Sequence, residues 1–473
     1  MMSLEERLRS AGQGHLAEAL ARLDGEPRDR LRTELEGLDL ELIGRLAGEL
    51  VAADPPSVVG AIEPPAPDAL IPIPRSDAER ERERRAREAG EEMLREGRVA
   101  AVLLAGGQGT RLGFDGPKGD YPFAPLSGRT LFAHHAAKIA ALRARYGPLP
   151  WYVLTSPQND AATRAIFQRA GNFGLAPGSV RFVVQGTLPA VDRDSGAILL
   201  EGPDRVALSP DGHGGLLSAL RASGALDEMT HEGVETMFSF QVDNPLVRVC
   251  RPEVLGHHRL VGADMTSVVV RKLGPEEKMG VIARVDGKTA VVEYSDLPDE
   301  LAEARDEDGE LVYWGGSIAV HCIQVAFASA LTEGGLRLPF HRAVKRVPYL
   351  DAGGQPVDPA EPNAIKFETF LFDALPLASR TVTVEAARED EFSPIKNAEG
   401  PDSPATARRD LNRLYARWLE AAGVAVPRDG DGEPVDLEVD PRWALDAEEL
   451  AASLPPGFAL DGPTVFSPGA ASP

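Results

Sequence analysis

The sequence is poor in cysteine, has fewer basic than acidic residues (50 against 73), and contains no long hydrophobic run. Its two cysteines, Cys250 and Cys322, provide neither a disulfide framework nor a structural zinc set. A net charge of −23 argues against binding to nucleic acid or to anionic membrane surfaces, because both require a basic footprint. No run reaches the roughly 18 apolar residues of a membrane span, and the start MMSLEERLRS lacks the basic and apolar regions of a signal peptide. We therefore expect a cytoplasmic protein.

The most informative segment is a short apolar strand that runs into a glycine-rich loop. Val99–Leu104 is continuously apolar, as expected for a strand buried on both faces of a parallel sheet. The loop carries four glycines and two cations: Gly106, Gly107, Gly109, Gly113, Arg111 and Lys118. Glycines let backbone N–H groups approach anionic oxygens, Arg111 offers a planar fork, and Lys118 offers a mobile point charge. The segment predicts a phosphate-binding loop, with an ordinary tight strand-to-helix turn as the alternative.

The spacing of this loop excludes two better-known phosphate loops. Three residues separate Gly109 from Gly113, whereas the dinucleotide fingerprint has two at that place. The ATPase-type loop needs Gly-Lys followed by Ser or Thr, but Lys118 stands between Pro117 and Gly119. A hydride-transfer enzyme and a P-loop enzyme are therefore not supported.

The pattern of apolar runs predicts an α/β fold. Short runs alternate with helical stretches such as 131–146 and 160–170, which indicates a mostly parallel sheet with helices on both faces. The runs are Val99–Leu104, Trp151–Leu154, Val180–Val184, Thr236–Val242 and Thr266–Val270. Asp286-Gly287 lies between two alternating runs and predicts a hairpin beside this sheet.

The two ends of the chain differ from this centre. Ser3 and Glu6 form a capping box, and leucines recur at helical spacing to residue 50, which predicts an N-terminal helical region. We expect an extended connector over residues 53–74 and a solvated, charged helix over 78–98. A helix over 405–422 and weak strands predict a small C-terminal domain or lid, with a disordered end at 467–473. These signals divide the chain into residues 1–97, 98–400 and 401–473.

A set of motifs identifies a family resemblance. The run Leu104-x-Gly-Gly-Gln-Gly-Thr-Arg-Leu-Gly113, followed by Pro117-Lys-Gly119, resembles the UDP-N-acetylglucosamine pyrophosphorylases of the eukaryotic type. Further blocks match in the same order: Pro150-Trp-Tyr-Val-Leu-Thr155, Gln185-Gly-Thr-Leu-Pro189, Asp211-Gly-His-Gly-Gly215, Val242-Asp-Asn244, Val291-Val-Glu-Tyr-Ser-Asp296, Ile365-Lys-Phe-Glu-Thr-Phe370 and residues 388–398. The resemblance implies a Rossmann-like nucleotidyltransferase sheet. It also implies an enzyme that makes a UDP-sugar and pyrophosphate from UTP and a sugar 1-phosphate, with N-acetylglucosamine 1-phosphate as the first expectation.

The resemblance further implies a role for each residue at a matching position. Catalytic cations are Arg111, Lys118 and Lys396. The nucleotide contacts are Gly106, Gly107, Thr110, Gln185, Gly212 and His213, of which the last three correspond to the uracil and ribose contacts. The sugar contacts are Gly280, Glu293, Ser317, Phe370 and Phe372, although phenylalanines more often serve a core.

Such a reaction brings two anions together, so cations and positioning are expected to dominate catalysis, with no protein nucleophile. A divalent ion, Mg²⁺ or Mn²⁺, can bridge phosphate oxygens. Asp243 is the candidate ligand, because it follows the apolar run Thr236–Val242 and open α/β sheets bind ligands at the carboxyl ends of their strands. The alternative is that Asp243 only caps the following turn.

Departures from the family pattern leave the sugar open. Trp314, Ser317 and His213 stand where the family has asparagine, and a histidine at the last position looks more like the UDP-glucose pyrophosphorylases. A UDP-glucose or broad-specificity enzyme is therefore the alternative. A non-catalytic UDP-sugar-binding protein would lose the cations, which are present here. A glycosyltransferase would place a D-x-D element after a strand, but Asp192-Arg-Asp194 lies in a turn-rich loop. The expected partners are UTP and a sugar 1-phosphate, with no nucleic acid, no membrane, and a monomeric or weakly homo-oligomeric state.

Overall fold

The structure, a computed structural model, describes residues 2–51 and 60–469 of the 473-residue chain. By their internal contacts these residues form two compact units. The N-terminal unit comprises residues 2–51, 185–219 and 334–374. The sheet unit comprises residues 60–184, 220–333 and 375–469.

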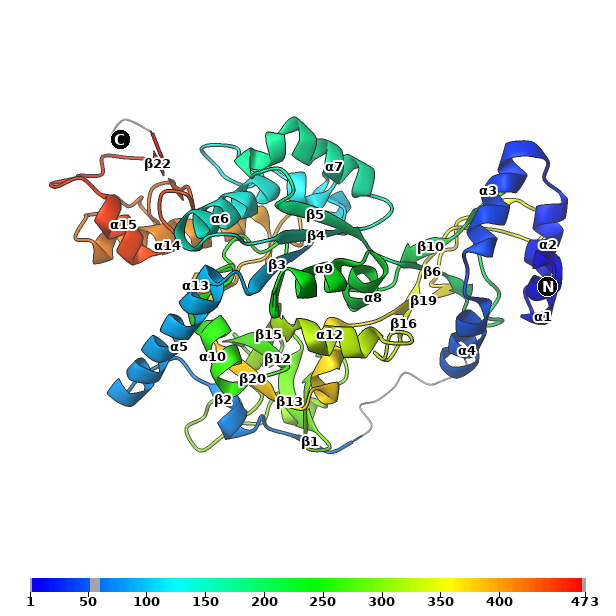
Figure 1. The fold of residues 1–473 in the computed structure, drawn as a ribbon, viewed down its shortest axis with the longest axis horizontal. Helices are drawn as coiled ribbons and strands as arrows, with labels where there is room; N and C mark the ends of the chain where they lie inside the picture. Colours follow the sequence, from blue (N-terminus) through cyan, green and yellow to red (C-terminus); the bar gives the residue numbers. More distant parts are fainter. Residues whose placement is uncertain (1, 52–59, 470–473) are drawn as a thin grey trace. The chain divides into compact units, whose positions relative to one another are not determined.

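The sheet unit is built on a mostly parallel sheet, which confirms the predicted fold class (Figure 1). Its main path runs β2-β20-β12-β15-β11-β3-β4-β5, and every neighbouring pair is parallel except the two that involve β15. The bounds are β2 Leu70–Ile71, β3 Val99–Leu104, β4 Trp151–Thr155, β5 Val180–Val184, β11 Thr236–Gln241, β12 Met265–Arg271, β15 Gly315–Gln324 and β20 Thr381–Glu385. All six residues of β3 are buried, as its unbroken apolar sequence requires.

The predicted hairpin adds an antiparallel patch to this sheet. Strands β13 (Val281–Val285) and β14 (Lys288–Val292) pair across Asp286 and Gly287, whose φ angles of +50° and +77° fit a tight hairpin turn. Strand β1 (Ile62–Glu63) pairs with β13 on its other side, and Val281 of β13 pairs with Gly316 of β15. The residues that flank the open end of the hairpin are therefore held close to β15.

Helices flank this sheet, with bounds close to those expected for the central part of the chain. They are α5 Asp77–Arg95, α6 Leu131–Tyr146, α7 Asp160–Arg169, α9 Ala225–His231, α10 Pro252–Val261, α11 Asp299–Ala302, α12 Val325–Thr332, α13 Arg388–Glu391, α14 Pro404–Ala421 and α15 Ala447–Ser453, while α8 (Gly215–Ala222) spans the boundary of the two units. Short 3₁₀ segments are η1 Pro67–Ala69, η2 Thr110–Leu112, η3 Lys118–Asp120, η4 Gly171–Gly174 and η5 Leu371–Leu377. No described helix is both long enough and apolar enough to cross a bilayer.

Helix α5 is less solvated than its charge pattern suggested. Most of its arginines and glutamates are exposed and paired with each other, but Ala86 and Gly90 are buried against α10. A Cβ added at Gly90 would lie 1.9 Å from the carbonyl oxygen of Pro252, and one at Gly256 would lie 1.7 Å from that of Ala86. Small residues at these positions therefore allow two helix backbones into contact, a signal that the dense charge of the segment concealed.

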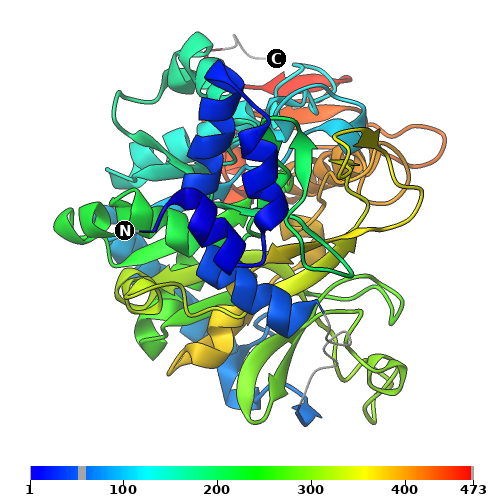
Figure 2. The same cartoon turned by 90° about the vertical axis from the view of Figure 1, so that its right-hand side faces the viewer.

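The N-terminal unit combines the predicted helical region with short strands. Its helices are α1 Leu4–Ser10, α2 Gly14–Ala21, α3 Gly25–Glu36 and α4 Leu40–Leu50, shown in blue in Figure 2. The Ser3–Glu6 capping box is present as predicted, and leucines such as Leu16, Leu31 and Leu46 are buried in a core shared with Phe367. The strands pair as β6 Thr187–Pro189 with β10 Leu208–Pro210, β19 Ala364–Glu368 with β16 His341–Lys345 and β7 Val191–Asp192, β8 Leu200–Gly202 with β9 Arg205–Val206, and β17 Tyr349–Leu350 with β18 Pro356–Val357.

The two units cut across the expected division at residues 97 and 400. Segments 185–219 and 334–374 join the N-terminal helices, which a contiguous division could not represent. The C-terminal residues belong to the sheet unit, because the buried stripe of α14 continues the core that surrounds β3, and strands β21 (Leu437–Val439) and β22 (Thr464–Phe466) complete it. Part of the connector predicted over residues 53–74 and part of the tail predicted over 467–473 lie outside the described residues.

Candidate functional site

The glycine-rich loop follows directly from β3 in the sheet unit and is closed by its own backbone. The amide of Lys118 donates to the carbonyl of Gly107 at 3.1 Å, and the amide of Gly109 donates to that of Gly116 at 2.9 Å. From outside the loop, the side-chain amide of Asn159 donates to the carbonyl of Ala105 at 2.8 Å. These bonds fix the loop in one shape before any ligand is bound.

The outer side of this loop is open. Gly107, Thr110 and Arg111 are exposed, and a Cβ built at Gly107 would meet no heavy atom within 4 Å. Gly113 has a φ of +66°, which only glycine adopts at little cost, and it ends the short helix η2 that carries Arg111. The predicted phosphate residues therefore share one preformed loop, in which Gly107, Thr110 and Arg111 are exposed.

Lys118 and Asp243, predicted for two different roles, form a direct ion pair. The Lys118 Nζ lies 3.0 Å from Oδ2 of Asp243, and both side chains are more than four-fifths buried. The two residues lie 125 positions apart and follow β3 and β11, which are adjacent parallel strands. Parallel neighbours end at the same edge of a sheet, so the fold itself brings this lysine and this carboxylate together.

A third segment reaches the same place. The amide of Ile395 donates to the carbonyl of Asp243 at 2.8 Å, and the side-chain amide of Asn244 donates to the carbonyl of Glu391 at 2.7 Å. Lys396, the next residue, has its Nζ 3.7 Å from Oδ2 of Asp402 and its side chain about half exposed. The three predicted catalytic cations are thus carried by the loop and by the segment that borders Asp243.

Side chains of helix α6 form hydrogen bonds with the backbone of the loop that follows β11. His135 is bonded to the carbonyl of Val242 at 2.9 Å, and His134 to that of Pro245 at 3.1 Å. The ammonium of Lys138 donates to the carbonyls of Pro245 and Val247 at 2.6 and 2.7 Å. Burial lowers the pKa of His135 to about 3, so this imidazole is neutral at physiological pH. The backbone around Asp243 is consequently fixed by three side chains of one helix face.

The predicted sugar contacts of the sheet unit also meet. Gly280 precedes β13 and Glu293 follows β14, so both flank the open end of the hairpin. The amide of Ser317, in β15, donates to the carbonyl of Gly280 at 2.8 Å. A Cβ at Gly280 would lie 3.1 Å from Oε1 of Glu293 and 2.7 Å from Cγ1 of Val291. Glycine is therefore required here for the carboxylate to lie against the backbone.

The remaining predicted residues lie in the N-terminal unit, where Gln185 and Gly212 are joined through Asp211. The Nε2 of Gln185 donates to Oδ1 of Asp211 at 2.9 Å and to the carbonyl of Gly212. Both N–H groups of this amide are committed, which leaves Oε1 as an acceptor. Gly212 has a φ of +83°, and a Cβ there would lie 2.3 Å from the carbonyl oxygen of Thr369. Burial raises the pKa of Asp211 to about 6, although the Gln185 bond opposes the rise.

His213, Phe370 and Phe372 form one aromatic group in the same unit. The His213 and Phe370 rings stack with centroids 5.3 Å apart, His341 stacks on Phe370 at 4.7 Å, and Phe372 lies 5.1 Å from Phe370. The amide of Leu371 donates to Nδ1 of His213 at 3.0 Å. Burial, together with His341, lowers the pKa of His213 to about 4, so the ring is neutral and carries its proton on Nε2.

The described residues contain no group of three or more His, Cys, Asp or Glu side chains that could hold a metal ion by themselves. A protein site for Mg²⁺ commonly supplies only one or two carboxylates and takes its other ligands from water and substrate phosphates. Asp243 fits that pattern, because one of its oxygens faces Lys118 and a carboxylate has a second oxygen to offer.

Comparison with known proteins gives the family. The sequence matches the family described as UTP-glucose-1-phosphate uridylyltransferase over residues 60–401. The chain belongs to this uridylyltransferase family. It is 39% identical to UDP-N-acetylhexosamine pyrophosphorylase-like protein 1 of Homo sapiens, over 95% of this chain and 94% of that protein. It is 37% identical to UDP-N-acetylglucosamine pyrophosphorylase of Saccharomyces cerevisiae, over 76% of this chain and 77% of that protein.

A solved structure agrees with this assignment. The uridine diphosphate N-acetylglucosamine pyrophosphorylase from Trypanosoma brucei, crystallised in complex with an inhibitor, matches with a TM-score of 0.81 and 27% identity over 99% of both chains. The resemblance recognised from the motifs is therefore confirmed, as is the nucleotidyltransferase-like sheet. The roles assigned to individual residues of this uridylyltransferase stay predictions.

Sequence reasoning missed several residues of the site. Asp211 stands in a matched block but received no role, although its carboxylate organises Gln185. Asn159, a fully buried polar residue at the start of α7, was not noticed because asparagine before a helix usually acts as a cap. His341, paired with Asp373 at 2.7 Å, lies outside every matched block. Only Asp211 had a signal that could have revealed it.

Proposed function

We propose that this chain transfers a uridylyl group from UTP to a sugar 1-phosphate, with N-acetylglucosamine 1-phosphate as its preferred acceptor, and releases pyrophosphate. The observation that carries the proposal is the Lys118–Asp243 pair at 3.0 Å beside an open glycine loop. The pair joins the cation that we assign to phosphate and the carboxylate that we assign to a metal ion, at the carboxyl edge of a parallel sheet, in a chain of the uridylyltransferase family.

The reaction forms a bond between a phosphate oxygen of the sugar and the α-phosphorus of UTP, and it breaks the bond from that phosphorus to the oxygen that bridges to the β-phosphate. Both reactants are anions, so the main task of the protein is neutralisation and alignment. We assign the triphosphate to the backbone of Gly106 and Gly107, to Thr110 and to Arg111 and Lys118. Lys396 is assigned to the phosphate of the sugar.

Asp243 would hold Mg²⁺, or Mn²⁺, with phosphate oxygens as further ligands. When bound, this ion supplies Lewis-acid neutralisation of those oxygens. Lys118 places a second positive charge beside the same carboxylate and keeps its Oδ2 oriented. This charge also reduces the repulsion between Asp243 and the substrate phosphates. The bonds from α6 and Ile395 hold the Asp243 backbone, so little reorganisation is needed when substrates bind.

The base and the ribose are assigned to Gln185, Gly212 and His213. With both of its N–H groups committed, the Gln185 amide presents an acceptor, which complements the N3–H donor of uracil. Cytosine has an acceptor at the same ring position, so the same amide would discriminate against CTP. The neutral His213 offers an Nε2–H donor to an oxygen of the nucleotide.

The sugar is assigned to Gly280, Glu293, Ser317, Phe370 and Phe372. A carboxylate accepts hydrogen bonds from two neighbouring hydroxyls, which suits Glu293. Ser317 offers a single donor where the family has an asparagine, and His213 also replaces an asparagine. These two positions favour a second candidate, an enzyme that accepts glucose 1-phosphate or several sugars. The cytoplasmic location expected from the sequence is kept as part of the proposal.

The test is pyrophosphate release from UTP, Mg²⁺ and a panel of N-acetylglucosamine, N-acetylgalactosamine and glucose 1-phosphates. We expect the highest kcat/KM with N-acetylglucosamine 1-phosphate, and Asp243→Ala is expected to lower turnover about a hundredfold or more. Asp308→Asn, an exposed loop carboxylate of the sheet unit, is the matched control and should leave turnover unchanged. If none of the three sugar 1-phosphates supports pyrophosphate release, the proposed enzymatic activity is wrong. A preference for glucose 1-phosphate would change only the proposed sugar substrate.

The asparagine position gives a second, sharper test of the sugar. Ser317→Asn introduces an amide, which has two polar groups where serine has one. The ratio of kcat/KM for N-acetylglucosamine 1-phosphate to that for glucose 1-phosphate should therefore rise about tenfold, the effect of one buried hydrogen bond. An unchanged ratio would mean that Ser317 does not contact the acetamido group.

A further inference from the structure

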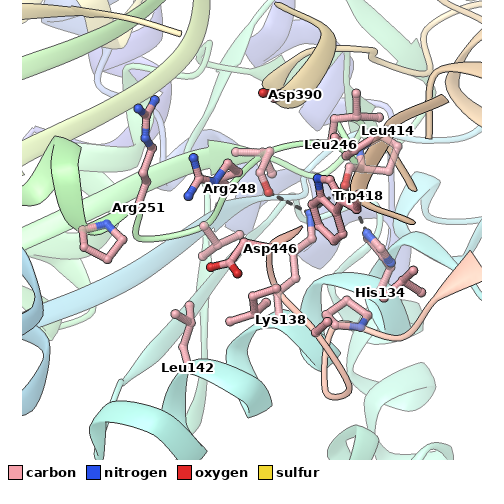
Figure 3. Close-up of a pocket in the computed structure, with 18 of the residues that line it drawn as sticks. His134, Lys138, Leu142, Leu246, Arg248, Arg251, Asp390, Leu414, Trp418 and Asp446 are labelled. Atoms are coloured by element: carbon pink, nitrogen blue, oxygen red, sulfur yellow. Dashed lines mark hydrogen bonds between the residues drawn. The ribbon is translucent and has the colours of Figure 1, made fainter. Parts of the chain in front are cut away.

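A cavity of about 80 Å³ lies in the sheet unit and is lined in part by residues 245–249, which follow Asp243 in the sequence; Figure 3 shows the lining side chains. Its walls come from α6, α14, the segment 245–253 and the C-terminal segment around Asp446. None of the residues proposed above to bind substrates lines it. Leu142, Leu246, Leu414 and Trp418 make much of the wall apolar, so charged groups inside it are poorly screened.

The charge of this cavity is opposite to that of the chain. Five basic side chains and three acidic ones line it, which gives a lining charge of +2 in a protein of net charge −23. The basic residues are Arg87, Lys138, Arg145, Arg248 and Arg251, and the acidic residues are Glu253, Asp390 and Asp446. A local excess of positive charge in an acidic protein attracts anions.

Three of the five cations already have carboxylate partners. Arg251 contacts Glu83, Glu253 and Glu391 at 3.1 to 3.2 Å, Arg145 contacts Glu449 at 2.5 Å, and Arg87 contacts Glu253 at 3.9 Å and Glu448 at 3.7 Å. These arginines are structural, because each holds two or more elements together.

Lys138 and Arg248 differ from the other three. Among the described residues, no carboxylate lies within 4.0 Å of the charged end of either side chain, although Glu253, which lines the same cavity, interacts electrostatically with Arg248 over a longer distance. The ammonium of Lys138 spends two of its three N–H donors on the carbonyls of Pro245 and Val247, while the His134 ring binds the first of these, and dashed lines in Figure 3 mark such bonds. Burial lowers the pKa of Lys138 to about 7, Glu391 opposes this shift, and the charge of Arg248 adds to it. Two cations that repel each other therefore share one cavity.

We propose that this cavity is a binding site for a small phosphate-class oxyanion, held between Lys138 and Arg248. A tetrahedral oxyanion accepts the third N–H of Lys138 and the fork of Arg248 at the same time, and its charge removes their repulsion. The cavity volume is of the size of one such ion, and its apolar wall strengthens each charged hydrogen bond.

The site is placed to influence the proposed catalytic edge. Pro245 and Val247, whose carbonyls accept from Lys138, follow Asp243 by two and four residues. An oxyanion on the third N–H keeps Lys138 protonated, and therefore keeps both of these bonds. Occupancy would hold the loop after Asp243 in the conformation described here.

The experiment titrates inorganic phosphate into the full chain by isothermal titration calorimetry and follows hydrogen exchange. We expect saturable binding in which residues 138–146 and 245–252 gain protection. Arg248→Gln should weaken this binding at least about tenfold, since one charge-assisted contact is lost. Arg248→Lys should recover part of it. Arg145→Gln, which removes a cavity cation that is already paired, is the matched control and should stay within about twofold of the unmodified chain.

The outcomes separate this site from the substrate site. Equal phosphate affinity of Arg248→Gln and the unmodified chain would overturn the proposal, as would protection confined to the glycine loop at 105–118. Acetate binding as tightly as phosphate would overturn the phosphate assignment. Arg248→Gln should still release pyrophosphate from UTP and sugar 1-phosphate without added phosphate, so failure of the proposed function is recognised independently.

Discussion

Asp211 gives a prediction whose sign is unusual for a carboxylate. Its side chain is enclosed by backbone, since Cβ atoms built at Gly186 and Gly215 would lie 2.7 and 1.9 Å from its oxygens. Burial raises its pKa from 3.8 to about 6, so the folded protein binds the Asp211 proton more tightly than the unfolded chain does. Stability therefore falls as the pH rises from about 4 to about 6, and the loss is complete above the folded pKa.

The size of the effect follows from the same two values. The difference between the ordinary pKa and a folded pKa of about 6 corresponds to roughly 3 kcal/mol, as an upper value at pH 8. Asp211→Asn removes the charge and keeps an oxygen that accepts from Gln185. The N–H groups of the new asparagine change the free energy of unfolding by the same amount at every pH. The change in the stability difference between pH 4 and pH 8 therefore isolates the charge, and we expect it to favour Asp211→Asn by up to roughly 3 kcal/mol.

The assay must report on the N-terminal unit. All four tryptophans, at positions 151, 314, 418 and 443, lie in the sheet unit, so intrinsic fluorescence does not serve. Hydrogen exchange of peptides from residues 205–219, compared between the two proteins at the same pH, gives the local opening free energy. Asp194→Asn, whose carboxylate is 85% exposed, is the control. An Asp211→Asn advantage of the same size at pH 4 and pH 8 would mean that the charge of Asp211 does not destabilise the N-terminal unit.

Three further predictions concern the sheet unit. Lys118→Met should lower kcat about a hundredfold or more in pyrophosphate release and should also lower the melting temperature in calorimetry, because Asp243 loses its buried partner; a lower melting temperature with unchanged kcat would mean a purely structural lysine. Gly280→Ala should raise KM for sugar 1-phosphate about tenfold and leave KM for UTP alone, because its Cβ would press on Val291 and Glu293, while Gly48→Ala, with no atom nearby, should change neither. EDTA should abolish turnover of the unmodified enzyme, and added Mg²⁺ should restore it. Full activity in EDTA would mean that the reaction needs no metal ion.

The central fold could be predicted because its signals are local. Continuous apolar runs specify buried parallel strands, and β3 and β5 begin and end at the predicted residues. The Lys118–Asp243 pair was also within reach, since both residues follow strands of one parallel sheet. A motif that directly follows a parallel strand lies at the carboxyl edge of the sheet, whichever strand is its neighbour.

Other features could not be predicted because they depend on partners distant in sequence. Ala86 and Gly90 of α5 make a close helix contact only because Gly256 of α10 packs against them, and the sequence of α5 alone does not show this partner. His134 and Lys138 appear in sequence as ordinary residues of an amphipathic helix, and their bonds to the loop after β11 arise from tertiary packing alone. The N-terminal unit gathers three separate segments, and hydrophobic periodicity contains no information on such pairing.

The distribution of positive charge connects the proposed reaction with the oxyanion cavity. In this acidic chain most arginines find carboxylates nearby, as Arg84 does with Glu81 and Glu88 on α5. A cation without such a partner is informative only where the fold also excludes water or leaves backbone N–H groups open. Arg111 meets this condition on an open glycine loop, and Arg248 meets it in an apolar cavity. We propose a phosphate oxygen from outside the chain for both positions, because no described carboxylate lies within 4.0 Å of either guanidinium, although Glu253 interacts electrostatically with Arg248.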